Sequence, residues 1–306
     1  MDKISMAIDA VRTKIPRLNY RLNEPMKNHT SFMIGGPVRA MFFPETAEEL
    51  VELCGLLNGF DDMPLIIGNG TNLLVDDGKQ LEMTVIKTTG IDNMTQTGET
   101  EITAGAGVSL KRLAEFACEC GLSGLEYAHG IPGSLGGAVS MNAGAYGREM
   151  KDVVCSSRAF GVLAGMHVIT AAQHGFGYRH SGFSEAGDIV LSSSVRLQKD
   201  EKKRIAEKME DLHSMRSESQ PLDLPSAGST FKRAKDGYAA ELIDRAGLKG
   251  CSVGGAQVSK KHSGFIVNNG GATFADIISL IEHVRETVLM RFGIELEPEI
   301  KIIKEK

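Results

Sequence analysis

The stretch GIPGSLGGAVSMNAGAYG, residues 130–147, contains six glycines and no charged side chain. Glycine lets the backbone approach a neighbour closely, because no Cβ intervenes. Successive backbone N–H groups in such a loop can converge on an anion. The residues alone leave two interpretations open. The stretch either holds a phosphate-bearing cofactor or forms a glycine-rich corner that packs against the rest of the fold.

A second glycine-rich segment, GNGTN, follows the apolar run PLII. Taken alone, it is either a plain tight turn or an anion-binding loop. Two uncharged loops of this kind suit a dinucleotide whose pyrophosphate is held mainly by backbone amides. Their spacing is not the G-x-G-x-x-G of a Rossmann turn, so a flavin in another fold is expected rather than NAD. The candidate cofactor-binding residues are Gly68, Asn69, Gly70, Thr71, Asn72, Gly130, Ile131, Pro132, Gly133, Ser134, Gly136, Gly137, Asn142, Ala143 and Gly144.

Short apolar runs alternate with helical patterns before the glycine-rich stretch. The runs at 38–43, 64–67 and 83–87 read as strands, and Thr46 with Glu49 forms a capping box that opens a helix between the first two. A strand in 101–108 and a helix from Ser109 to Gly121 follow. This β-α-β pattern predicts an α/β unit.

The charged segment at about 200–215 is the best candidate for a domain boundary. Beyond it the sequence predicts a helix ending near Gly247, a strand at 264–267, a long helix capped by Thr273 and a final strand at 299–303.

Composition limits the possible classes of function. The chain has 306 residues, a net charge of −5 and no run of like charges, which argues against nucleic acid as a partner. Asp2, Lys3 and Asp9 interrupt any signal peptide, and no later segment offers about 18 uncharged apolar residues. A cytoplasmic protein without membrane insertion is expected. The five cysteines and eight histidines lack the spacing of a metal site, so no metal is expected.

Two short segments carry residues suited to catalysis. FGYRHSGF places Tyr178 beside Arg179, and a fixed guanidinium can grip a carboxylate or phosphate through two hydrogen bonds, although an exposed arginine is commoner. LPSAGSTFKR places Ser229 near Lys232 and Arg233. That serine is either a proton donor or a helix N-cap.

Two further segments add charge. LEPEI contains Glu297 and Glu299, of which one could be partly desolvated and serve as an acid, or both could be surface charges. Lys260, Lys261 and His262 form a compact cationic set that faces either a phosphate or water.

Taken in order, the segments resemble UDP-N-acetylenolpyruvoylglucosamine reductases, the MurB family of flavoenzymes. The resemblance runs through NHTSFMIGG, GNGTN, GIPGSLGGAVSMNAGAYG, YRHS, PSAGSTF, ELIDRAGLKG, KKHSGFIVN and LEPEI, which covers nearly the whole chain beyond its first 25 residues. An ordered set of this length is far more specific than any one motif.

The resemblance implies an α+β protein with two α/β FAD-binding subdomains of the vanillyl-alcohol-oxidase (PCMH) type and a C-terminal α+β substrate-binding domain. The expected bounds are 1–88 for the first subdomain, 89–204 for the second and 205–296 for the substrate domain, with the C-terminal strand at 297–306 returning to the second subdomain. Arg179 and Ser229 lie about 50 residues apart, which resembles the shorter type II members.

The resemblance also implies a reaction. NADPH reduces non-covalent FAD, and UDP-N-acetylglucosamine enolpyruvate then enters the same site and is reduced to UDP-N-acetylmuramate, a peptidoglycan precursor. Ser229 matches the serine that protonates the substrate, while Arg179 and Glu299 match residues that stabilise the intermediate. The expected substrate-binding residues are Tyr178, Arg216, Lys232, Arg233, Lys261 and His262, and a monomer is expected.

Two departures from the family pattern concern substrate grip. Ser219 stands where a basic residue is usual, so either Arg216 supplies the phosphate contact or the contact is absent; Ala234 replaces a common proline. Two other functions remain as alternatives. An oxidase of the same flavin fold acting on an alcohol or lactone would give no role to Arg179, Ser229 and Glu299. A flavin- or nucleotide-binding protein without catalysis is the other.

Overall fold

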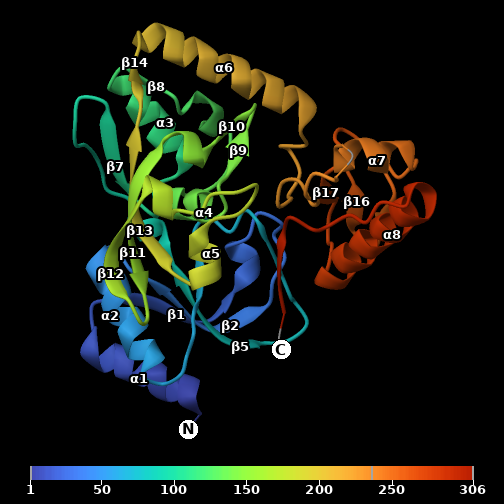
Figure 1. Cartoon of the computed structure of the whole chain (residues 1–306). Coiled ribbons are helices and arrows are strands. Elements are labelled where there is room, and N and C mark those ends of the chain that lie inside the picture. The colour runs from blue at the N-terminus through green and yellow to red at the C-terminus, as the bar shows by residue number, and fades with distance from the viewer. Residues whose placement is uncertain (1, 236, 305–306) are drawn as a thin grey trace. The chain divides into compact units, whose positions relative to one another are not determined.

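The computed structural model describes residues 2–235 and 237–304 (Figure 1). These residues divide into two compact units. The first comprises 2–22, 39–69 and 83–215, and the second comprises 23–38, 70–82 and 216–304. The unit boundary between residues 215 and 216 falls in the last turn of helix α6 (Lys202–Ser219), the charged helix that the sequence marks as a boundary. The division into three subdomains with their own bounds stays a prediction.

A four-stranded sheet, most of whose residues belong to the first unit, has the strand order β1-β2-β5-β3. Strands β3 and β5 run parallel. Thr46 caps the helix next to this sheet by accepting a hydrogen bond from the Glu49 N–H over 3.1 Å, as predicted. The elements are α1 (Lys3–Lys14), β1 (Asn19–Pro25), β2 (Pro37–Phe43), α2 (Ala47–Asn58), β3 (Leu65–Ile67), β5 (Leu81–Lys87) and the 3-10 turn η2 (Thr88–Gly90).

A five-stranded sheet with the order β12-β11-β13-β7-β6 forms the rest of the first unit. Its strand pairs are antiparallel, and its core is built with the apolar faces of α3 and α4. Ser109 caps α3, as predicted. The elements, green to gold in Figure 1, are β6 (Met94–Gln96), β7 (Glu101–Gly105), α3 (Leu110–Glu119), β8 (Leu122–Ser123), η3 (Glu126–Ala128), α4 (Leu135–Ser140), β9 (Gly144–Ala145), β10 (Arg148–Glu149), η4 (Met150–Asp152), β11 (Val154–Gly161), β12 (Gly165–Thr170), η5 (Ala171–Gln173), α5 (Gly182–Ala186), β13 (Ile189–Arg196) and β14 (Gln198–Lys199).

The second unit has its own core beneath the buried stripe of α8. Thr273 and Asp276 form the capping box that opens α8, and each backbone N–H bonds the other residue's side chain. The elements are η1 (Met26–Asn28), β4 (Leu73–Val75), α7 (Ala239–Arg245), β15 (Ser252–Val253), β16 (Ala256–Val258), β17 (Ile266–Asn268), α8 (Phe274–Phe292) and β18 (Lys301–Ile303).

The C-terminal strand corrects one prediction. β18 pairs in parallel with β4, with Ile302 opposite Leu74, so it joins a segment of the range predicted as the first subdomain and not a strand of 89–204. The contact extends one residue before β4, where the Asn72 side-chain amide donates to the Glu299 carbonyl oxygen and the Asn72 carbonyl oxygen accepts from the Lys301 N–H. Among the described residues, no helix is both long and apolar enough to cross a membrane.

Candidate active site

The centre of the glycine-rich stretch runs against the turn between β7 and α3. The Leu135 N–H donates to the Val108 carbonyl oxygen over 2.8 Å, and the Gly136 N–H donates to that of Ala106 over 2.9 Å. A Cβ added at Gly136 would lie 2.9 Å from the Ala106 Cβ. These two amides are therefore used within the chain, and the packing-corner interpretation holds at Gly136.

Ser134 is the polar exception in this corner. The residue is 2% exposed, its hydroxyl has no hydrogen-bond partner among the described residues, and it does not cap α4 although α4 begins at the next residue. A Cβ added at Gly68 would collide with the Ser134 hydroxyl. An unsatisfied buried hydroxyl costs about 1–3 kcal/mol. A rotation about χ1 would let a diphosphate oxygen satisfy it, so these residues fit a dinucleotide such as FAD.

Residues 142–144, predicted to bind the cofactor, make contacts within the chain. Asn142 is fully buried and its side-chain N–H groups donate to Glu149 Oε2 over 3.0 Å and to the Gly177 carbonyl oxygen over 2.8 Å. The Ala143 N–H donates to Ala138, and a Cβ at Gly144 would collide with the Arg148 carbonyl oxygen. The Asn142 side-chain amide and the Ala143 N–H are therefore used within the chain, and a cofactor contact by residues 142–144 stays a prediction.

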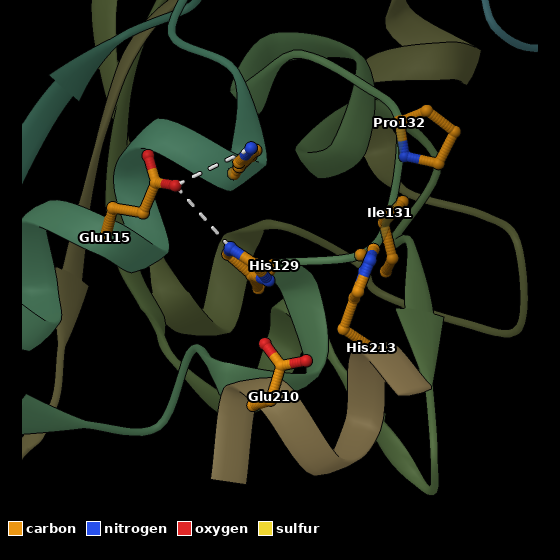
Figure 2. Close-up of a pocket in the computed structure, with 8 residues that line it drawn as sticks. Glu115, His129, Ile131, Pro132, Glu210 and His213 are labelled. Carbon is orange, nitrogen blue, oxygen red and sulfur yellow. Dashed lines mark ion pairs between the residues drawn. The ribbon is translucent and has the colours of Figure 1, made fainter. Parts of the chain in front are cut away.

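A pocket of about 470 Å³ lies beside the start of the stretch (Figure 2). Glu115 has two neighbours in it, with its Oε1 3.8 Å from Lys111 Nζ and 3.6 Å from His129 Nε2. The carboxylates of Glu115 and Glu210 in this pocket would repel a diphosphate but can accept hydrogen bonds from sugar hydroxyls. The lining residues are Lys111, Glu115, His129, Gly130, Ile131, Pro132, Glu210 and His213.

The part of GNGTN that belongs to the second unit is held tightly. Gly70 has φ +65°, its carbonyl accepts from the Ser31 N–H over 3.1 Å, and a Cβ there would collide with the His29 carbonyl. The Asn72 side-chain amide donates to the Glu299 carbonyl oxygen over 3.3 Å. The predicted cofactor loop therefore contacts the backbone of Glu299, the residue predicted to be catalytic.

Tyr178 and Arg179 are the two central residues of a tight turn in the first unit. Gly177 and His180 close the turn with reciprocal backbone bonds of 3.0 and 3.3 Å. Arg179 has φ +53°, and its guanidinium lies 5.0 Å from the centre of the Tyr178 ring. Arg179 is partly buried, so the alternative of a freely exposed arginine does not hold.

Ser229 and Glu299 lie on adjacent backbone segments of the second unit. The Glu299 N–H donates to the Thr230 carbonyl oxygen over 2.8 Å, and the Lys232 N–H donates to that of Glu297 over 2.9 Å. The next helix, α7, begins only at Ala239, so Ser229 is no helix cap. The structure thus pairs the backbone segments that carry the serine and the glutamate singled out by the sequence.

The predicted cationic residues differ in their surroundings. Lys232 pairs with Glu297, and Lys261 Nζ donates to the Ser217 carbonyl oxygen. The Arg233 guanidinium stacks 4.6 Å from the centre of the Tyr238 ring. Arg216, in the last turn of α6, is buried.

His262 corrects the prediction of a three-residue cationic set. Burial lowers the pKa of His262, because a charged imidazole loses hydration. Its Nδ1 accepts a hydrogen bond from the Gly264 N–H over 3.2 Å, and its ring contacts Phe265 edge-on. The imidazole is therefore neutral at pH 7, and the positive charge rests on Lys260 and Lys261.

The segment FGYRHSGF places Ser181 with Tyr178 and Arg179, but the sequence assigns it no role. Its side chain is fully buried and its hydroxyl donates to the Ser140 carbonyl oxygen over 2.5 Å. A serine beside a turn has no periodic pattern that would identify it, and the partner lies 41 residues earlier. Its place in the segment YRHS is the only signal.

Comparison with known protein families finds a match in each of two parts of the chain. Residues 38–173 match the family described as an FAD binding domain, and residues 220–303 match that described as the C-terminal domain of UDP-N-acetylenolpyruvoylglucosamine reductase. These matches confirm the predicted fold class: an FAD-binding domain of the PCMH type together with the C-terminal domain of this family.

Full-length relatives and a solved structure agree with these matches. The UDP-N-acetylenolpyruvoylglucosamine reductases of Caldanaerobacter subterraneus and Agathobacter rectalis are each 46% identical, over 98% and 97% of this chain and 98% of each relative. The crystal structure of the Thermus caldophilus reductase (MurB) superposes with a TM-score of 0.80 at 34% identity, covering 94% of this chain and 99% of that one. With its FAD-binding domain, its C-terminal domain and its full-length relatives all in agreement, the chain belongs to the UDP-N-acetylenolpyruvoylglucosamine reductase family.

Proposed function

We propose that this protein reduces UDP-N-acetylglucosamine enolpyruvate to UDP-N-acetylmuramate, with NADPH as reductant and FAD as cofactor. The relatives' shared name supports the reaction, and the matched FAD-binding domain supports the cofactor. The single observation that carries the proposal is the backbone pairing that sets Ser229 beside Glu299. When bound, FAD would supply the chemistry of taking a hydride from NADPH and passing it to the enol ether.

The residues at Gly68 and Ser134 would hold the diphosphate. Gly68 leaves room beside the Ser134 hydroxyl, which would turn from its buried position to donate to a phosphate oxygen. The pocket beside Ile131 and Pro132 would take the adenosine end, since Glu115 and Glu210 can accept from ribose hydroxyls. Asn69, Thr71, Gly130, Gly133 and Gly137 stay predicted cofactor contacts.

Arg179 would stabilise negative charge on the substrate. As charge develops at carbon 2 of the enolpyruvyl group, it spreads into the carboxylate, and a guanidinium can meet a carboxylate with two parallel hydrogen bonds. Tyr178 holds the guanidinium near its ring, and the closed turn fixes the backbone. Donors fixed in advance stabilise such charge most effectively, because they need no reorganisation during the reaction.

Ser229 and Glu299 would complete the reduction. The Ser229 hydroxyl donates a proton to carbon 2, and the Glu299 carboxyl in its protonated form donates a hydrogen bond to the developing enolate oxygen. Glu299 is held on both sides, because its N–H bonds Thr230 and its carbonyl accepts from Asn72. These bonds fix the backbone of Glu299 relative to the residue that follows Ser229.

Cationic and polar residues of the second unit would grip the sugar nucleotide, and Tyr178 in the first unit stays a predicted substrate contact. Lys232, Arg233, Lys261 and Arg216 supply charge for its phosphates, and His262 acts as a neutral hydrogen-bonding group. Because NADPH and the nucleotide sugar are multiply charged and membrane-impermeant, we place the reaction in the cytoplasm. We further propose a monomer, because this one chain supplies every residue of the proposed site.

Anaerobic spectroscopy tests the reaction. The purified protein should be yellow, its flavin absorbance should bleach with NADPH, and it should recover when UDP-N-acetylglucosamine enolpyruvate is added. UDP-N-acetylmuramate should form in equal amount to the NADPH consumed. Recovery that requires oxygen, with no sugar product, would indicate an oxidase and overturn the proposal.

A further inference from the structure

The turn that carries Arg179 is hydrogen-bonded on both sides to the C-terminal end of α4 and the residues just after it. On its N-terminal side, the Gly177 carbonyl oxygen accepts from the Asn142 side-chain amide over 2.8 Å. On its C-terminal side, the Ser181 hydroxyl donates to the carbonyl oxygen of Ser140, the last residue of α4, over 2.5 Å. The two hydrogen bonds therefore hold the turn at both of its ends.

Burial gives these two bonds their importance. Asn142 and Ser181 are both fully buried, so water cannot replace either side chain as a partner. Loss of the Ser181 hydroxyl removes the side-chain donor of the Ser140 carbonyl oxygen, and loss of the Asn142 amide leaves the Gly177 carbonyl oxygen with the 3.3 Å bond from the His180 N–H alone. Asn142 is itself braced, because Glu149 Oε2 accepts from it and its Oδ1 accepts from the Lys151 N–H over 2.9 Å.

The backbone of the turn needs such support. Arg179 has φ +53° and Asn142 has φ +47°, both in the left-handed region. Asparagine adopts this region more readily than most residues, but arginine has no such preference. Strained residues of this kind persist only where the surrounding structure holds them, and they gather at functional sites.

The base of the loop is also closed. The Gly182 N–H donates to the His174 carbonyl oxygen over 2.8 Å, and the His174 ring stacks on Phe176 with centroids 4.7 Å apart. His174 Nε2 and the Ser157 hydroxyl lie 2.9 Å apart in a hydrogen bond. The loop therefore has a rigid base, and its tip takes its position from Asn142 and Ser181.

We infer that Asn142 and Ser181 are positioning residues that fix Arg179 relative to the cofactor segment. The short helix α4 starts directly after Ser134 and ends at Ser140. One rigid element thus joins the proposed diphosphate contact to the clamp on the turn. The inference rests on the roles proposed above for Arg179 and Ser134, and it gives Asn142 a task besides the predicted cofactor contact.

Ser181→Ala in the full-length holoenzyme tests the inference. Stopped-flow absorbance would follow flavin reduction by NADPH and, separately, its reoxidation by UDP-N-acetylglucosamine enolpyruvate. We expect reoxidation to slow by about 10- to 100-fold, the range for a displaced catalytic group, and reduction to change by less than about twofold. Thr103→Val is the matched control, since it removes the 2.7 Å hydroxyl bond to Ser194 in the same unit and should leave both rates unchanged.

A double-mutant cycle separates the inference from the function on which it rests. Arg179→Ala alone should slow reoxidation, and adding Ser181→Ala to it should slow reoxidation no further, because Ser181 acts only through Arg179. Unchanged reoxidation in Arg179→Ala would overturn the role of Arg179. Two results would overturn the positioning role alone, given slow reoxidation in Arg179→Ala. One is a wild-type reoxidation rate in Ser181→Ala. The other is a double variant whose rate is lowered by the product of the two single effects. If Ser181→Ala does not fold, Ser181→Cys, which keeps the packing and weakens the bond, takes its place in the same cycle.

Discussion

Glu299 and Thr230 are joined by a 2.8 Å hydrogen bond from the Glu299 N–H to the Thr230 carbonyl oxygen. The bond ties the C-terminal end of the chain to the residue next to Ser229. Thr230 is in turn anchored, because its N–H donates to Gly264 and its hydroxyl accepts from the Ile266 N–H over 3.0 Å. The position of the proposed proton donor therefore depends on a network of main-chain bonds around one buried threonine.

Thr230→Val should weaken this network. The substitution removes the acceptor of the Ile266 N–H in a fully buried place, so the free energy of unfolding should fall by about 1–3 kcal/mol. Urea titration followed by circular dichroism would measure it. Thr230→Ser keeps the hydroxyl and is the control. Equal stability of Val and Ser variants would show that the hydroxyl bond contributes nothing.

Gly68→Ala should reduce FAD affinity while leaving the fold intact. The added Cβ would lie 3.0 Å from the Ser134 Cβ as well as against its hydroxyl, so rotation of the hydroxyl alone cannot relieve the contact and Ser134 shifts from the position in which it would bind the diphosphate. Loss of one hydrogen bond to a charged group costs about 1.5–3 kcal/mol, or about 10- to 100-fold in the dissociation constant. Calorimetric titration of the apoprotein with FAD would measure this.

Gly55→Ala provides the comparison for that variant. Gly55 lies inside α2, where nothing is within 4 Å of an added Cβ, so alanine should raise helix stability by up to about 1 kcal/mol without changing FAD binding. Wild-type affinity in Gly68→Ala would exclude the proposed diphosphate contact.

Burial of His174 should make stability depend on pH. Burial lowers the pKa of His174, so the folded protein holds it neutral while the unfolded chain binds a proton below its ordinary pKa of about 6.5. Stability is thus complete above that value and falls as the pH decreases below it. His174→Gln, which cannot titrate, should lose less unfolding free energy between pH 7.5 and pH 5.

Chemical denaturation at the two pH values checks this prediction. His283→Gln is the control, because it makes the same substitution at an exposed histidine on α8. If His174→Gln lost as much stability on acidification as the wild type, the buried imidazole would not be the source.

Local patterns in the sequence predicted most of the fold. Thr46, Ser109 and Thr273 cap the helices expected of them, because a cap depends on residues only three positions apart. The pairing of β18 with β4 joins residues more than 200 positions apart, and no local pattern encodes it. For that reason the C-terminal strand was assigned to the wrong partner.

The site shows the same division. The segments that carry Ser229, Arg179 and Glu299 were identifiable from their residue types and order, yet the clamp from Asn142 to Gly177 spans 35 residues and was not. Asn142 in a glycine-rich stretch favours a cofactor contact, and its hydrogen-bond partners within the chain could not be predicted from that stretch. The lowered pKa of His262 likewise results from burial, and burial could not be predicted from the neighbouring residues Lys260 and Lys261.

The half-reactions of Ser229→Ala test the central claim most directly. General acid catalysis typically contributes about 10²- to 10⁴-fold to a rate, and the hydroxyl is needed only when the substrate is protonated. Anaerobic stopped-flow should therefore show flavin reduction by NADPH within about twofold of the wild type, and reoxidation by the enolpyruvyl sugar nucleotide slower by about 10²-fold or more. Equal loss in both half-reactions, or none in reoxidation, would contradict the assignment of Ser229 as the proton donor.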